Sequence, residues 1–232
     1  ERLDVLEAAY DYFAAGGVKT VLHAGNIVDG ESRLNRFDLK VHGITDQALY
    51  CLDHYPARAG MTTFYITADD HEGWWHQREG LDFGRYLMYE ATHRGRKDLI
   101  HLGYQEADLD FPTRKGHAVV RVMHPGGGTA YAHSYAPQKI VESYQGGEKP
   151  CLLIVGHFHK MNYDQVRNVH VVQAGCCQDQ TTFMRKQKLE AHVGFWLLRF
   201  SPDITGGVRI VSPTAVTFYD RGYHLSSVKG TK

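Results

Sequence analysis

The hydrophobic positions of the chain follow two patterns, one helical and one extended. Leu3, Leu6, Tyr10 and Phe13 recur at the spacing of an amphipathic helix, and a glycine pair at 16–17 follows the last of them. Similar spacing predicts further helices over 45–58, 83–93 and 137–144. Short runs of β-branched and aromatic residues separate these helices and predict buried strands over 18–23, 62–67, 99–102, 118–123 and 151–155.

The last third of the chain is mostly β-like. Hydrophobic runs over 169–173, 192–200 and 208–216 predict three further strands. Residues 1–232 contain no internal repeat and no convincing linker. Alternating helices and buried strands followed by a β-rich end therefore predict a single α/β domain, in which two packed mixed β-sheets are flanked by helices.

Composition narrows the classes of partner and compartment. The 232 residues carry 26 Lys and Arg against 26 Asp and Glu, so no net charge attracts the protein to nucleic acid or anionic membranes. A local basic patch could still bind nucleic acid. No apolar run approaches the roughly 20 residues that span a bilayer, and we expect no membrane partner. Four cysteines without C-x-x-C or framework spacing predict reduced thiols in a cytoplasmic protein.

Histidines, carboxylates and amides gather just after four of the predicted strands. Histidine is the commonest metal ligand, and the chain has 15 of them. Because the carboxyl ends of strands in an open α/β sheet meet at the edge where ligands bind, we expect these segments to form one site. The four segments are Gly25-Asn26-Ile27-Val28-Asp29-Gly30, Asp69-Asp70-His71-Glu72, His124-Pro125-Gly126-Gly127-Gly128 and Gly156-His157-Phe158-His159.

Each segment alone has an ordinary interpretation. A single Gly-Asn-x-x-Asp-Gly is more often a turn, and Asp69-Asp70 can cap a helix. The glycines at 126–128 lack the Lys-Ser/Thr of a phosphate-binding P-loop. Four such segments in order, each after a predicted strand, favour a common site over chance.

The order of the segments resembles that of the calcineurin-like metallophosphoesterase superfamily. Its motifs read Asp-x-His, Gly-Asp-x-x-Asp, Gly-Asn-His-Asp/Glu, a lone His and Gly-His-x-His, and the likeness here spans 26–159. The segments at 124–128 and 135–139 are similar to a phage-type, repair-exonuclease-like group within it. The resemblance implies a four-layer α/β/β/α sandwich that hydrolyses phosphate esters.

The resemblance also implies a role for each matching position. Two divalent metal ions, Mn²⁺ before Fe or Zn²⁺, would share the side chain of Asn26. Asp70, His124 and His157 would complete one metal site, and His159 would serve the other. A metal-activated hydroxide would attack the phosphorus.

Catalysis in such a site also needs a proton donor. His71 would stabilise the phosphate or protonate the leaving oxygen, with Asp29 orienting its ring. The leading expectation is a phosphodiesterase, namely a nuclease acting on DNA or RNA. A phosphatase for small molecules or proteins is the first alternative. A scaffold of the same fold with weakened catalysis is the second.

Two departures from the family pattern bear on how complete the site is. Asn26 stands where the family has a bridging Asp, and Asp70 where it has Asn, so the formal charge is kept. The Asp-x-His motif is absent, together with the strand that carries it. We expect residues upstream of Glu1 to supply that strand, and its omission to leave a hydrophobic slot. The metal site at His159 is then half built.

A few residues near the motifs are candidates for binding substrate. Arg36, Arg78 and Arg185 could hold a phosphate, and Trp74 could stack on a base. For each arginine an ordinary surface role is an equal interpretation, and packing is the better interpretation for one of Trp74 and Trp75.

Overall fold

The computed structural model describes residues 1–33, 35–128 and 130–218. Its elements follow in the order α1 (Leu3–Ala15), β1 (Thr20–Ala24), α2 (Ile44–His54), β2 (Thr62–Thr67), α3 (Gly73–Glu79), α4 (Phe83–His93), β3 (Leu99–Tyr104), β4 (Glu106–Pro112), β5 (His117–Met123), α5 (Tyr135–Ser143), η1 (Gly146–Glu148), β6 (Leu152–Val155), β7 (Met161–Val166), β8 (Val169–Ala174), α6 (Thr182–Gln187), β9 (Gly194–Pro202) and β10 (Val208–Thr217).

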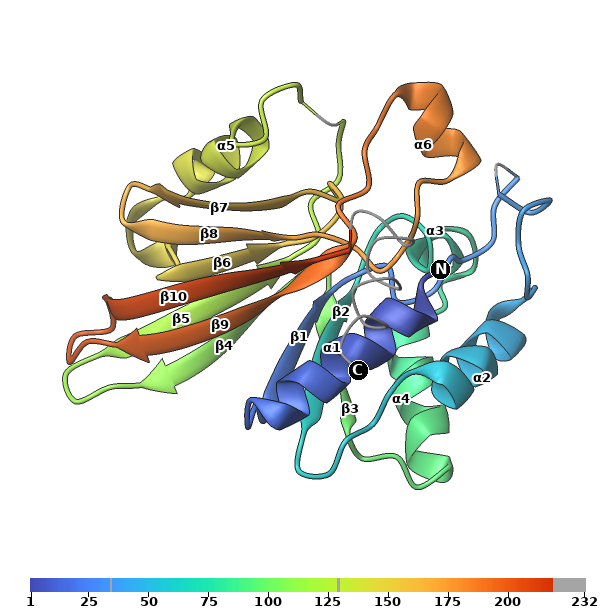
Figure 1. Ribbon diagram of the computed structural model, residues 1–232, viewed down its shortest axis with the longest axis horizontal. Coiled ribbons are helices and arrows are strands. Elements are labelled where there is room, and N and C mark those ends of the chain that lie inside the picture. Colours follow the sequence, from blue (N-terminus) through green and yellow to red (C-terminus); the bar gives the residue numbers. More distant parts are fainter. Residues whose placement is uncertain (34, 129, 219–232) are drawn as a thin grey trace, which may run out of the picture.

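The described strands form three sheets. The first is parallel, in the order β1-β2-β3, and β1 lies at its edge. The second has the order β4-β5-β6-β8-β7, with a parallel centre and antiparallel strands at both edges. The third is the antiparallel hairpin β9–β10. In Figure 1 helices α2 and α4 lie on the outer side of the first sheet, and α5 on the outer side of the second.

Strand β9 shows how the layers share a core. Trp196, Leu198 and Phe200 pack with the apolar cluster that joins the first two sheets. The alternate residues Phe195 and Leu197 pack with the cluster beneath helices α1, α2 and α4. Successive side chains of a strand point to opposite faces, so one strand contributes to both cores. The layers are therefore helices α2 and α4, the first sheet, the second sheet and helix α5.

The predicted α/β fold with packed sheets flanked by helices is confirmed, and the predicted helices and strands correspond to structural elements. The structure differs in having three sheets rather than two, because β9–β10 pairs with neither of the others. Five elements, α3, α6, η1, β4 and β7, were not predicted from the hydrophobic pattern. No helix of the described residues is long and apolar enough to cross a membrane.

Gln105 joins the first two sheets at one end. It lies between β3 and β4 with φ of 64°, in the left-handed region. Its backbone N–H donates to the carbonyl oxygen of Thr67 at 2.7 Å, and its carbonyl oxygen accepts the N–H of His124 at 2.7 Å. One residue thereby fixes the end of β2 against the end of β5.

Candidate metal centre

The four motif segments leave the carboxyl ends of β1 and β2 in one sheet and β5 and β6 in the other. Asn26, His71, His157 and His159 have φ of 57°, 49°, 74° and 52°. A left-handed backbone is uncommon for non-glycine residues, and such strain clusters at functional sites. These four are half of the eight such residues in the described part of the chain, which marks this edge as the functional one.

Three predicted ligands meet at this edge. The metal-binding atoms of Asp70, His124 and His157 all lie within 4.8 Å of one another. Nε2 of His124 is 3.3 Å from Oδ1 of Asp70, and Nδ1 of His157 is 3.4 Å from Oδ2 of the same carboxylate. His124 is 1% exposed, so this cluster is anchored in the protein interior.

Hydrogen bonds on the far side of each ring fix which nitrogen faces the carboxylate. Nδ1 of His124 donates to the carbonyl oxygen of Ala24 at 2.6 Å, and Nε2 of His157 donates to that of Gly127 at 2.8 Å. When the rings are neutral, the opposite nitrogens therefore present lone pairs toward Asp70. These two nitrogens and Oδ1 of Asp70 are buried and have no hydrogen-bond partner.

Three convergent, unpartnered lone-pair atoms fit a metal ion. Buried polar atoms are rarely left unsatisfied, and a cation between them would satisfy all three at once. Backbone carbonyls that bind the outer nitrogens of ligand histidines are the usual support for such a site. Two imidazoles and a carboxylate suit a transition metal such as Mn²⁺, Fe or Zn²⁺.

Charge in the cluster is consistent with that interpretation. Burial alone raises the pKa of Asp70, but the imidazoles of His124 and His157 outweigh it and hold that pKa well below its usual range. Burial lowers the pKa of His157, yet the Asp70 carboxylate reverses the effect and raises it. Asp70 is therefore the negative centre of the group.

Glycines allow the rings to pack this tightly. A Cβ on Gly25, whose φ is 88°, would lie 2.4 Å from Nδ1 of His124, and one on Gly156 would lie 2.1 Å from the carbonyl oxygen of Ala24. Neither approach is possible for a larger residue. The glycines that precede Asn26 and His157 are thus required by the position of the His124 ring.

His71 stands beside the cluster with one nitrogen already engaged. Its Nδ1 donates to Asp29 at 3.1 Å, but the acceptor is the backbone carbonyl oxygen and not the carboxylate that sequence reasoning favoured. This bond orients the ring and leaves Nε2 for a ligand. Trp74 stacks on the ring with centroids 5.3 Å apart and planes at 20°. Trp75 is instead a core residue, 3% exposed and stacked on Phe83.

The other half of the predicted site is less complete. Asn26 and His159 line the same cavity as His124 and His157. Oδ1 of Asn26 is buried without a hydrogen-bond partner. Among the described residues, however, His159 belongs to no group of three ligand atoms within 4.8 Å. Burial and the neighbouring histidines lower the pKa of His159 to about 4, so its ring is neutral near pH 7.

Glu72 is a site residue to which sequence reasoning gave no role. It is 0% exposed, and its Oε1 accepts the backbone N–H groups of Asn26 at 3.0 Å and Ala68 at 3.1 Å. Burial raises its pKa to about 8. The side chain ties the loop after β1 to the loop after β2. The signal was its place directly after His71, within the motif itself.

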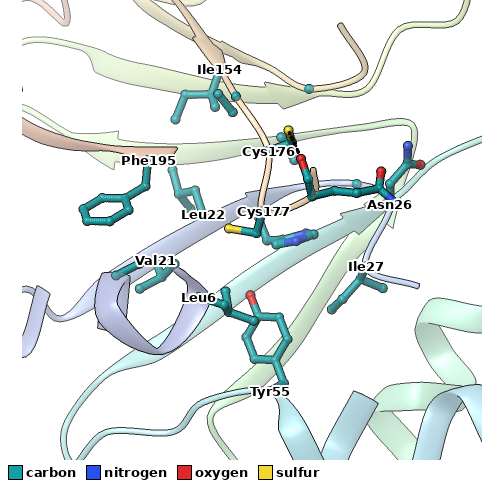
Figure 2. A pocket seen from close by; sticks show the side chains of 18 of the residues that line it. Leu6, Val21, Leu22, Asn26, Ile27, Tyr55, Ile154, Cys176, Cys177 and Phe195 are labelled. Carbon is teal, nitrogen blue, oxygen red and sulfur yellow. Dashed lines mark hydrogen bonds between the residues drawn. The ribbon is translucent and has the colours of Figure 1, made fainter. Parts of the chain in front are cut away.

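An apolar cavity of about 500 Å³ extends from this edge between β1 and β9. Figure 2 shows Val21, Leu22, Ile154 and Phe195 around it, with Asn26 at one end. The cavity borders the outer edge of β1, the side on which that strand has no partner among the described strands. His23 also lines it, and burial lowers the pKa of this histidine to about 4.

The predicted substrate-binding arginines do not line this cavity. Arg36 pairs with Glu31 at 2.9 Å, and Arg78 with Glu79 at 3.2 Å. Arg185 is exposed on α6. Of the four predicted substrate-binding residues, Trp74 is the one that contacts the candidate centre, by stacking on His71.

No protein-family model and no curated protein matches the chain. Its structure is similar to that of an archaeal phosphodiesterase, with a TM-score of 0.46, 13% identity and coverage of 93% of this chain and 94% of that one. A Vps29 mutant from Entamoeba histolytica (TM-score 0.38, 12% identity, 86% and 97% coverage) and a Thermotoga maritima protein (0.37, 14%, 86% and 100%) are also similar. Similarities this distant do not indicate a function for this chain.

Proposed function

We propose that the protein is a metal-dependent phosphoesterase that cleaves phosphodiesters, with DNA or RNA as the substrate class. One observation carries the proposal. Three buried lone-pair atoms, on Asp70, His124 and His157, converge without a partner beside His71. An anionic carboxylate flanked by two imidazole nitrogens would hold a divalent cation, and the oriented ring of His71 beside it would face a bound phosphate.

The residues divide into ligands and a proton donor. Asp70, His124 and His157 would hold one ion, and Asn26 and His159 would contribute to a second. When bound, such ions supply a Lewis acid and lower the pKa of coordinated water. His71, whose Nδ1 is bonded to the Asp29 carbonyl, would donate from Nε2 to the leaving oxygen.

The cavity beside β1 borders Asn26 and His159, the residues that would hold the second ion. We propose that an extended segment pairs with the outer edge of β1, fills the cavity and reaches the site near Asn26. Such a strand would lie between β1 and β9 and join the parallel sheet to the β9–β10 hairpin. Two sheets would then replace three, as the sequence pattern predicted.

A substrate panel tests the activity. The purified protein with Mn²⁺ is expected to hydrolyse bis-p-nitrophenyl phosphate and degrade labelled single-stranded DNA. His71→Asn should lower kcat by about 10²- to 10⁴-fold, the range for a lost general acid. His76→Asn, an exposed histidine on α3, is the matched control and should be unchanged. Hydrolysis of only p-nitrophenyl phosphate would support a phosphatase, and no hydrolysis at all a scaffold.

Trp74 tests the nucleic-acid part of the proposal. If a base stacks on its ring, Trp74→Ala should raise KM for single-stranded DNA by about tenfold, since stacking contributes about 1–3 kcal/mol per base. Trp74→Phe keeps an aromatic face and should retain most of the affinity. KM for bis-p-nitrophenyl phosphate, which has no base, should change little in either variant. An equal rise for both substrates would contradict base stacking.

A further inference from the structure

A short segment after α6 holds the loop that carries His159. The backbone N–H of His192 donates to the carbonyl oxygen of His159 at 2.9 Å. In return, the backbone N–H of Met161 donates to Nδ1 of the His192 ring at 3.1 Å. Backbone and side chain of one residue therefore bind the loop on both sides of Lys160. This matters because His159 has φ of 52°, a conformation that needs support.

Glu190 completes the arrangement through charge. Its Oε2 accepts from Nζ of Lys160 at 3.0 Å and from Nε2 of His192 at 3.1 Å. Lys160 is 7% exposed, so its ammonium group needs a counter-charge. Lys160 and His192 together lower the pKa of Glu190 to about 2. The carboxylate thus neutralises a buried cation directly next to His159 in the chain.

These residues could be mistaken for a second metal site, because ligand atoms of His133, Glu190 and His192 lie within 4.8 Å of one another. The hydrogen bonds argue otherwise. Nδ1 of His192 accepts the Met161 N–H, so the ring proton is on Nε2 and points at Glu190. A metal ion at Nε2 would require an imidazolate. The group is therefore a hydrogen-bonded clamp.

We propose that His192 and Glu190 are positioning residues that hold His159 in its metal-binding orientation. The inference rests on the proposed function, because His159 is a ligand only if the site binds a second ion. Supporting residues of this kind contribute about 10- to 100-fold to metal affinity. The weaker of two Mn²⁺ sites, the one that uses His159, should respond, and the site at Asp70 should not.

A matched pair of variants tests the clamp. His192→Leu removes the acceptor for the Met161 N–H, whereas His192→Asn places an amide oxygen near the position of Nδ1. Calorimetric titration with Mn²⁺ should show at least tenfold weaker binding at the second site in His192→Leu, and recovery in His192→Asn. Equal affinity in wild type and His192→Leu would overturn the proposal. If His192→Leu does not fold, the exposed Glu190→Gln serves instead, with a smaller loss expected.

A second readout separates this proposal from the proposed function. In the metal-free protein, the ring resonances of His159 should shift in His192→Leu and stay near wild type in His192→Asn. That result stands even if the wild type binds no Mn²⁺, which would sink the function alone. Unchanged resonances in His192→Leu would overturn the clamp. His133→Ala should leave the number of bound Mn²⁺ ions unchanged, and loss of one ion would show a metal site in place of a clamp.

Discussion

The two halves of the candidate centre differ in how completely the chain supplies them. The half at Asp70, His124 and His157 has three convergent ligand atoms, and a backbone carbonyl fixes each of the two imidazole rings. The half at Asn26 and His159 has a neutral amide and a single imidazole, beside an apolar cavity. Asp70, His124 and His157 follow the paired strands β2, β5 and β6, and His159 also follows β6, whereas Asn26 follows the edge strand β1.

Removing the charge at the centre of the complete half should have the largest effect. Asp70→Asn keeps the shape of the side chain but removes the carboxylate between the two imidazoles. We expect the affinity of the tighter Mn²⁺ site to fall by at least about 100-fold, above the range for supporting residues. Isothermal titration calorimetry measures it. Asp53→Asn, an exposed aspartate on α2, is the control. Unaltered tight binding in Asp70→Asn would place the metal elsewhere.

Filling the cavity beside the incomplete half should stabilise the folded protein. An N-terminal extension of five Val and Ile residues, joined through a short Gly-Ser segment, can add a parallel strand to β1. Each buried side chain contributes about 1.5–3 kcal/mol, against about 1–2 kcal/mol per residue for ordering the chain. We expect a net gain of roughly 3 kcal/mol, seen as an increase of about 5–10 °C in Tm.

The matching control for this extension replaces its Val and Ile residues with Ser and Thr. The polar version cannot gain from an apolar cavity and should leave Tm unchanged. Equal Tm increases for both extensions would mean that the cavity is not the binding place.

His23, which lines the cavity beside the incomplete half, makes the stability of the fold sensitive to acid. Its pKa is about 4 in the folded protein against about 6.5 when unfolded, so between these values the unfolded state binds more protons. The contribution of His23 to the free energy of unfolding is therefore complete above pH 6.5 and is lost as the pH drops toward 4. Going from pH 7 to 5 should cost about 2 kcal/mol from this residue. Urea unfolding at both pH values should show a smaller loss in His23→Leu; an identical loss would exclude His23 as the source.

Asn26→Asp should narrow the difference between the halves. A carboxylate can give one oxygen to each of two ions, whereas an amide offers one neutral oxygen. We expect second-site affinity for Mn²⁺ to rise about tenfold, within the range of changes around a metal site. Asn168→Asp, at the exposed turn between β7 and β8, adds the same charge elsewhere and should do nothing. Weaker binding in Asn26→Asp would show that the amide is required.

The sequence predicted the elements whose hydrophobic pattern is strong and missed both edge strands of the second sheet, β4 and β7, together with short helices. Strand β4 is acidic and mostly exposed, with only Ala107 and Leu109 half-buried, and a single neighbour, β5, pairs with it. Strand β7 ends in a turn at Arg167 and Asn168, with φ of 46° and 67° and no glycine to signal a hairpin. Both strands are stabilised by pairing with a neighbouring strand, and the local hydrophobic pattern of the sequence does not reveal that pairing.

For the candidate site, the position of the four motif segments after predicted strands predicted that they share one edge of the fold, because sheet topology sets where strands end. The family resemblance implied that Asp70, His124 and His157 meet there. The finer contacts depend on tertiary packing. Whether His71 would bind the carboxylate or the carbonyl of Asp29 depends on loop geometry, and so does the link that Glu72 makes to Asn26. Neither follows from residue order.

Anomalous diffraction at the manganese edge, from crystals soaked in Mn²⁺, locates bound ions without reference to activity. We expect a strong peak bounded by Oδ1 of Asp70, Nε2 of His124 and Nδ1 of His157, with a weaker peak near Asn26 and His159. No peak among the first three atoms, or a peak only at His133, Glu190 and His192, would contradict it.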